Sequence, residues 1–193
     1  QRPGSLTQKE GTAPRRTSAG LLGLTIPTEL GSLGQSMRVA AAVVDDIAQR
    51  CASTAMVTMM HYAGVNCYLA NPERFADILR AAAEGKHLST LAFSEKGSRS
   101  QFWAPVSQAV PTSDGKGVVY NAEKSWVPSA GYADGIVCSA GSEDGESVTA
   151  YLVLKNDPGL TISGGWNSLG MRGNQSNPMT MTDVALDYNA PRW

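Results

Sequence analysis

The hydrophobic pattern of this chain changes from helical to strand-like spacing near residue 88, and this change limits the fold more than any other feature. Before it, apolar residues such as Met37, Ala40 and Val44 recur every three or four positions, which predicts amphipathic helix. After it, short apolar runs are separated by turn sequences such as Asp114–Gly117, with no helical pattern between them. Helices followed by strands predict an α+β fold, an N-terminal helical segment followed by an antiparallel β-sheet or barrel domain.

Three helices are predicted in the first part of the chain. Ser36 is a suitable N-cap for the first, and Asn71 with Pro72 at the first helical position starts the third, which ends at Gly85. The second occupies residues 52–69, which carry no formal charge and are apolar nearly all round. Hydroxyl and amide side chains interrupt this stretch, so we expect a helix buried inside protein and no membrane span.

The chain divides into three predicted regions. Residues 1–19 are polar, rich in Pro and Gly and without periodicity, which predicts a disordered tail or linker. Residues 20–88 form a partial helical domain, and residues 89–193 form a β-domain. Its predicted strands are residues 89–93, 117–121, 123–127, 135–140, 147–154, 160–163 and 179–186.

Composition excludes several classes of function. The 193 residues carry a formal net charge of -1 and no basic patch, which argues against a nucleic-acid partner. The three cysteines are widely spaced and odd in number, which indicates a reducing compartment, and we expect a cytoplasmic protein without a disulfide framework. Cysteine and histidine are too scattered to predict a metal site.

Two loops have compositions suited to ligand binding. Residues 93–100 follow a strand and are rich in hydroxyls and flexible backbone, which can aim donors at a pyrophosphate or at a polar ring edge. An ordinary polar connection has the same composition and is favoured on the residues alone. Trp126 stands at a strand end beside Pro128, where its ring either packs on a flat ligand or belongs to the core. The residues leave these two interpretations open.

Several ordered motifs resemble those of the acyl-CoA dehydrogenase family of flavoproteins. They are Gly20–Pro27 with Gly31–Gly34, Cys51–Ala55, Leu91–Ser100, Asn121–Ala130, and Leu169–Ser176 followed by Asp183 and Val184. The resemblance runs from about Gly20 to about Leu186. It covers the later part of that family's N-terminal helical domain and the whole of its middle β-domain.

The resemblance implies a cofactor, a reaction and a set of binding residues. FAD would lie against the β-domain and accept a hydride during α,β-dehydrogenation of an acyl-CoA thioester substrate. The implied cofactor-binding residues are Leu91, Phe93, Ser94, Ser100, Trp126, Val127 and Pro128. Phe93 and Ser94 would reach the pyrimidine side of the flavin, and Trp126 would pack beside the isoalloxazine ring. Ser100 would lie near the FAD phosphates and would also bind the CoA end of the substrate.

Three positions depart from the family pattern. Pro128 replaces a threonine whose hydroxyl and backbone N–H approach flavin N5, and proline supplies neither donor, although Ser129 is a partial substitute. Lys96 replaces the family's proline. Arg99 replaces a glycine, so a residue with a side chain would have to adopt positive φ.

The resemblance assigns no catalytic residue to this sequence. The family's catalytic base is a carboxylate in a C-terminal helical domain, and this sequence stops at Trp193, where that domain would begin. We therefore expect a truncated form that lacks the base, and Glu95, which belongs to the FAD loop, is not a replacement for it. Residues 1–19 show no resemblance to the family's first helices.

Two alternatives to the dehydrogenase remain. One is a catalytically silent binding or assembly domain on the same scaffold, which Pro128 and the missing base favour. The other is a related flavin-dependent monooxygenase. In either case, a face of the β-domain that the absent C-terminal helices leave exposed would associate with a second copy or a partner subunit. The sequence specifies no electron acceptor.

Overall fold

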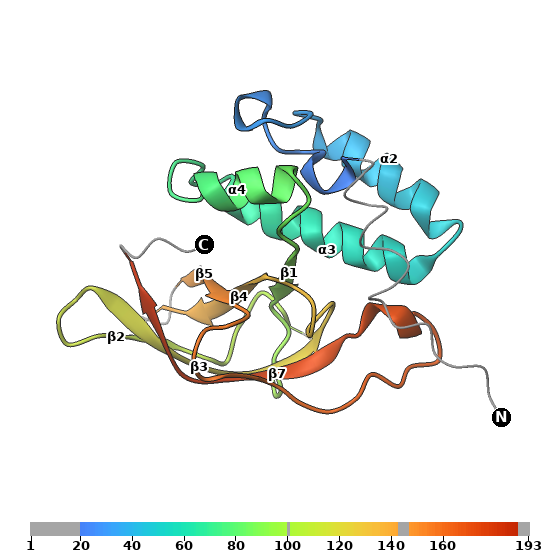
Figure 1. Cartoon of the computed structure of the whole chain (residues 1–193). Helices are drawn as coiled ribbons and strands as arrows, with labels where there is room; N and C mark the ends of the chain where they lie inside the picture. Colours follow the sequence, from blue (N-terminus) through green and yellow to red (C-terminus); the bar gives the residue numbers. More distant parts are fainter. Residues whose placement is uncertain (1–19, 100, 143–146, 189–193) are drawn as a thin grey trace. The chain divides into compact units, whose positions relative to one another are not determined.

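The computed structural model describes residues 20–99, 101–142 and 147–188 (Figure 1). These residues form two compact units. The helical unit comprises residues 20–88 and 167–174, and the β unit comprises residues 89–166 and 175–188. The segment 167–174 thus packs with the helices, although it lies within the range predicted as β-domain. The predicted tail at residues 1–19 lies outside the described residues.

The helical unit contains the three predicted helices. Its elements are η1 (Leu21–Gly23), η2 (Thr28–Leu30), α2 (Met37–Ala48), α3 (Ala52–Tyr68), α4 (Ala76–Ala83) and η3 (Arg172–Asn174). The Ser36 side chain accepts a hydrogen bond from the Val39 N–H at 3.5 Å, which confirms the predicted N-cap. Helix α4 begins later than predicted, because Asn71 instead accepts from the Arg74 N–H and holds the preceding residues in turns.

Polar groups of α3 bind the backbone of η1 inside the helical unit. His61 Nε2 lies 2.8 Å from the Leu22 carbonyl oxygen, and the Tyr62 hydroxyl donates to the Leu21 carbonyl oxygen at 2.9 Å. Both side chains are buried, so these bonds satisfy polar atoms that would otherwise destabilise the interior. The predicted buried helix is confirmed. In the part of the chain that the structure describes, no helix combines the length and apolar character needed to cross a membrane.

The β unit contains two sheets. The strands are β1 (Ser89–Ala92), β2 (Ala109–Pro111), β3 (Gly117–Val127), β4 (Gly135–Gly141), β5 (Val148–Leu154), β6 (Leu160–Ile162) and β7 (Asn177–Asp187). One sheet has the order β1-β4-β5 and the other β2-β3-β7-β6, with β3 and β7 side by side (Figure 1). The α+β prediction is confirmed.

Three details of the sheets differ from the sequence prediction. Strands β1 and β4 pair in parallel, where antiparallel pairing was expected, because the long connection through β2 and β3 returns the chain to the end of the sheet at which β1 began. The predicted strands 117–121 and 123–127 are one strand, β3, with a register shift between Tyr120 and Ala122. Strand β2 was not predicted, because only one of its residues, Ala109, is buried.

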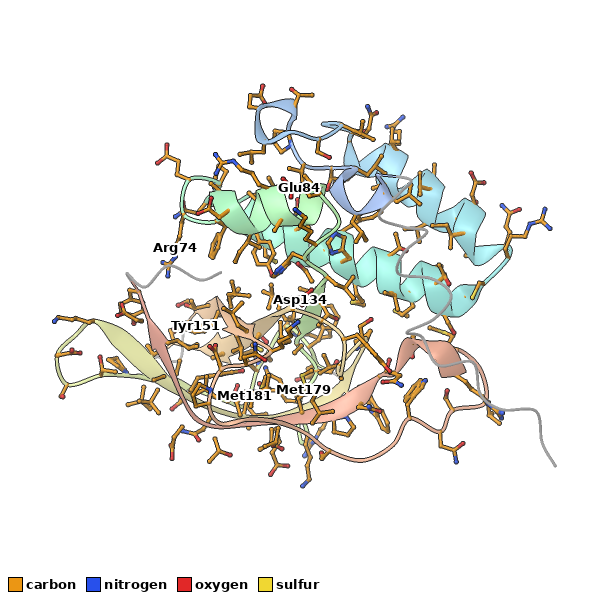
Figure 2. The ribbon with its side chains drawn as sticks, viewed as in Figure 1. Arg74, Glu84, Asp134, Tyr151, Met179 and Met181 are labelled. Atoms are coloured by element: carbon orange, nitrogen blue, oxygen red, sulfur yellow. The ribbon has the colours of Figure 1, made fainter. Side chains whose placement is uncertain are left out.

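The two sheets share one hydrophobic core. Met179 and Met181 lie on the same face of β7 and are each only 1% exposed, as expected for alternate positions of a strand (Figure 2). Tyr151 on β5, labelled in Figure 2, stacks on Tyr120 of β3 with ring centroids 6.1 Å apart, and this contact links the two sheets. The two sheets are therefore packed together through their side chains, and this packing fixes the positions of the strand ends from which the loops start.

Substitution of Gly159, in the turn before β6, provides a test of the packing of the β unit. A Cβ at Gly159 would lie 2.1 Å from the Thr182 carbonyl oxygen, whereas a Cβ at Gly115 would meet nothing within 4 Å. Both glycines have positive φ, so alanine strains the backbone at either position. We expect Gly159→Ala to lower the free energy of unfolding by about 2–4 kcal/mol and Gly115→Ala by about 1 kcal/mol, measured by urea denaturation. Equal losses would contradict the close approach at Gly159.

Candidate functional site

Two segments of the β unit lie together at the ends of β1 and β3. One is residues 93–99, which follow β1, and the other is residues 124–130, which end β3. The Ser125 N–H donates to the Ser94 carbonyl oxygen at 2.9 Å. Thr90 Oγ1 donates to the Pro128 carbonyl oxygen at 2.7 Å. The structure thus joins the two loops that the sequence predicted as ligand-binding segments.

A buried ion pair between Glu95 and Lys124 links these segments. The side chains are 2% and 0% exposed, and Lys124 Nζ donates to Glu95 Oε1 and, at 2.7 Å, to the Ser139 carbonyl oxygen. The Ser107 backbone N–H donates to Glu95 Oε2 at 2.8 Å, and the Ser107 hydroxyl donates to Oε1. Every charge in this cluster therefore has hydrogen-bond partners, which an ion pair needs in order to persist inside a protein.

Burial and the ion pair together determine the protonation states of the ionisable groups in this region. Burial disfavours the charged form of Glu95, but hydrogen bonds from Lys124 and Ser107 outweigh it and hold the pKa of Glu95 below its ordinary value. Burial also raises the pKa of Cys138 to about 12 and the pKa of Tyr120 well above its usual range. Glu95 is thus ionised, while Cys138 and Tyr120 stay neutral at physiological pH and serve as packing and hydrogen-bonding groups.

Trp126 projects from a β-bulge at the end of β3. Lys124 pairs with Met179 and Val127 pairs with Asn177, so three steps along β3 match two steps along β7. The extra residue turns the strand locally, and Trp126 adopts a φ of 54° with 62% of its surface exposed. Trp126 is therefore a solvent-facing ring, and the alternative of a buried core tryptophan is wrong.

Backbone strain is concentrated in the same region. Among the described residues, six without the freedom of glycine have positive φ, and three of them, Arg99, Trp126 and Ser129, lie in the site segments. Arg99 has a φ of 51°, as expected where the family has glycine. Left-handed conformations cost about 1–3 kcal/mol each and persist where surrounding structure enforces them, often at functional sites.

Two buried polar atoms beside the bulge lack hydrogen-bond partners among the described residues. They are Ser129 Oγ and Asn177 Oδ1. Asn177 pairs with Val127 across the sheet, and Ser129 follows Pro128, so both belong to the end of β3 and the start of β7. A hydroxyl and an amide oxygen beside an exposed tryptophan suit a flat ligand with a polar edge. The residues present therefore fit an aromatic cofactor such as a flavin.

The structure places most of the predicted site residues in this region. Leu91, Phe93 and Ser94 are half-buried, Trp126 is exposed, and Val127 and Pro128 are buried. Ser100 lies outside the described residues. The sequence placed Glu95 and Lys124 in separate motifs and gave no indication that they pair. No group of residues suited to holding a metal ion occurs within residues 20–99, 101–142 and 147–188.

Comparison with known proteins identifies the family. The model described as acyl-CoA dehydrogenase, middle domain, matches residues 90–184, and the one described as acyl-CoA dehydrogenase, N-terminal domain, matches residues 8–86. The chain belongs to the acyl-CoA dehydrogenase family. The second match begins before Gly20, so the likeness to the family extends into residues 1–19, where the sequence motifs had shown none.

The chain is also similar to individual acyl-CoA dehydrogenase family proteins. It is 27% identical to a probable acyl-CoA dehydrogenase, YngJ, of Bacillus subtilis over 174 residues, which are 86% of this chain and 45% of that protein. The chain spans less than half the length of the curated relatives it matches.

Two solved structures share the fold. A Bacillus anthracis acyl-CoA dehydrogenase complexed with FAD superimposes with a TM-score of 0.78 at 24% identity, covering 91% of this chain and 31% of that one. FMN-bound TdsC from Paenibacillus superimposes with a TM-score of 0.79 at 26% identity, covering 92% of this chain and 45% of that one.

In this member of the acyl-CoA dehydrogenase family, the residues next to the buried pair, Lys96 and Glu123, form a second ion pair that is exposed. Lys96 pairs with Glu123 at 2.9 Å, with side chains 78% and 59% exposed. We expect Lys124→Met to lower the free energy of unfolding by about 3–5 kcal/mol, because it leaves the Glu95 carboxylate buried without its cation. Lys96→Met is the matched control and should change stability little, because water screens an exposed pair. Urea denaturation of both variants checks this, and equal effects would contradict the burial of Glu95.

The ion pair should also make the free energy of unfolding depend on pH. The pKa of Glu95 is lower in the folded than in the unfolded state, so its stabilising contribution is present above the unfolded pKa. That contribution is lost as the pH falls below the ordinary glutamate range and through the folded-state pKa. We expect the free energy of unfolding to fall less steeply between about pH 5 and about pH 3 in the double variant Glu95→Gln/Lys124→Met than in the wild type. Parallel slopes would show that the pair does not lower the pKa of Glu95.

Proposed function

We propose that this chain provides the flavin site of an acyl-CoA dehydrogenase type of oxidoreductase that uses FAD. The observation that carries the proposal is the joining of residues 93–99 to residues 124–130 beside the exposed ring of Trp126. The fold shared with an FAD complex supports the choice of cofactor. The substrate class follows from the family: an acyl-CoA thioester that undergoes α,β-dehydrogenation.

The proposed binding roles follow from the chemistry of each group. The Trp126 ring offers an apolar face to the isoalloxazine, and Phe93 and Ser94 lie on the neighbouring loop, where they would meet its pyrimidine edge. Leu91, half-buried in β1, and Val127, buried at the end of β3, are the proposed supports of the two segments. Ser100 is the proposed contact to the FAD phosphates and to the CoA end of the substrate.

Pro128 changes how the cofactor would be held. Proline has no N–H, and the carbonyl oxygen of Pro128 already accepts the Thr90 hydroxyl. Ser129, whose hydroxyl is buried and without a partner among the described residues, is the proposed replacement donor. Pro128 would therefore contact the cofactor without donating to it, and the proposed hydrogen bond to the flavin would come from Ser129.

The cofactor supplies hydride acceptance when it is bound, and the described residues bind and orient it. Removal of the substrate α-proton needs an accessible carboxylate. Glu95 is ionised but only 2% exposed at its side chain and fully engaged with Lys124 and Ser107, so it does not serve as that base. We assign no catalytic base among the described residues. Association with a second copy or a partner subunit is proposed to complete the site.

The second candidate is a flavoprotein that uses FMN, such as a flavin-dependent monooxygenase on the same scaffold, and one observation favours FMN as the ligand. FMN-bound TdsC shares the fold at 26% identity, so FMN, which lacks the AMP moiety of FAD, is a reasonable ligand for this scaffold. A chain that binds FMN as tightly as FAD would support this alternative. A clear preference for FAD would support the dehydrogenase, because contacts from the 93–100 loop to the pyrophosphate then contribute to affinity.

The direct test is retention of flavin by the purified chain. We expect the chain, incubated with FAD and passed through gel filtration, to keep the absorbance band of oxidised flavin. Trp126→Leu should weaken FAD binding about 10-fold or more, because it removes the proposed stacking surface. Trp103→Leu, which removes a similarly exposed ring with no assigned role in the proposed site, is the control and should leave affinity unchanged.

The remaining outcomes are equally informative. If the wild type retains no flavin while Pro128→Thr does, the lost donor accounts for the failure and the scaffold is a silent descendant of a flavoprotein. If neither protein retains FAD or FMN, the proposal is wrong for this chain, and an assembly or binding role on the same scaffold becomes the better explanation.

A further inference from the structure

A second tryptophan contacts Trp126, from a part of the chain that no motif of the family marked. The ring of Trp166 lies 5.7 Å from that of Trp126 between centroids, with the ring planes inclined at 61°. Trp166 is half-buried, whereas Trp126 is 62% exposed. Both residues belong to the β unit, so the contact is internal to one compact body.

The course of the chain after β6 explains the contact. The Ser163 N–H donates to the Pro178 carbonyl oxygen at 3.1 Å, which holds the chain beside the first residues of β7. The neighbouring Asn177 pairs with Val127, directly after the bulge that carries Trp126. Trp166, three positions beyond Ser163, is therefore brought to the side of the bulge.

The edge-on geometry leaves ring surface available for a ligand. In a T-shaped contact the edge of one ring meets one face of the other, so at least one face of the Trp126 ring is not covered by Trp166, and 62% of the Trp126 surface is exposed. An edge-on neighbour restricts the side-chain rotamers of Trp126 while leaving a flat apolar surface exposed.

We propose that Trp166 is a positioning residue of the flavin site, which fixes the ring of Trp126 in the orientation that packs on the isoalloxazine. This inference rests on the proposed flavin-binding function. Trp166 acts through Trp126, so its contribution to binding depends on the presence of the Trp126 ring. It extends the site to a third segment, the residues that follow β6.

A double-mutant cycle on the full chain, with FAD as the probe, tests the proposal. We expect Trp166→Leu to weaken FAD binding about 2- to 10-fold, the range expected for loss of one aromatic contact. Trp166→Phe should recover most of the affinity, because it restores an edge-on ring. In the Trp126→Leu background, Trp166→Leu should have no further effect.

A spectroscopic readout separates positioning from mere stabilisation. Indole rings at contact distance quench flavin fluorescence, so FAD bound to Trp166→Leu should fluoresce more strongly per bound molecule than FAD bound to the wild type. Trp103→Leu is the matched control, since Trp103 also has an edge-on partner, Phe102, with centroids 5.1 Å apart. It should change neither affinity nor fluorescence. Equal urea midpoints for the two variants would confirm that both are folded.

Other outcomes would overturn the proposal in distinguishable ways. If the wild type binds FAD and Trp166→Leu changes neither affinity nor fluorescence, Trp166 has no role in the site while the proposed function stands. If Trp166→Leu weakens binding equally in the wild-type and Trp126→Leu backgrounds, Trp166 contacts the flavin independently and does not position Trp126. If the wild type binds no flavin, the proposed function fails and this inference fails with it.

Discussion

The buried ion pair of Glu95 and Lys124 is the interaction on which the geometry of the site depends. The first residue belongs to the loop after β1 and the second to β3, so the pair joins two segments distant in sequence. Neither charge can leave its partner without a large loss of stability, because the interior offers no water to replace it. The loop and the strand end therefore behave as one rigid body. A cofactor between them would meet preorganised surfaces, which lowers the entropic cost of binding.

The same rigidity explains how the site tolerates strain. Trp126, Ser129 and Arg99 hold backbone conformations that a free chain would avoid. Trp126 belongs to the paired strand β3, and Ser129 follows Pro128, whose carbonyl oxygen accepts the Thr90 hydroxyl. Arg99 follows Ser98, whose N–H donates to the Glu95 carbonyl oxygen in the turn after β1. The unfavourable conformations are therefore enforced by their surroundings. Their result is an exposed tryptophan ring and a buried serine hydroxyl without a partner among the described residues, at a point where a regular strand would have continued.

The structural features that could be predicted from the sequence were those determined by residues close together along the chain. The helical spacing around Met37, the cap at Ser36 and the turn chemistry between strands are local, and the structure confirms them. Resemblance to the family then located the two loops. The pairing of Glu95 with Lys124 and the contact of Trp166 with Trp126 were not predictable in this way, because each depends on distant segments meeting. The parallel pairing of β1 with β4 was missed for the same reason.

Pro128 shows how such non-local contacts alter the meaning of a motif. Read alone, the substitution removes a hydroxyl and an N–H from the centre of a flavin site. In the folded chain, Thr90 fixes the Pro128 carbonyl oxygen, and the bulge before it turns Trp126 outward. In the proposed site, binding would rely on ring packing, aided by the adjacent Ser129 hydroxyl, more than on a donor at position 128. Affinity for a flavin and control of its reactivity would then be separable in this chain. On this proposal, affinity would depend on Trp126 and its neighbour Trp166, and reactivity on whether Ser129 supplies the donor that proline cannot.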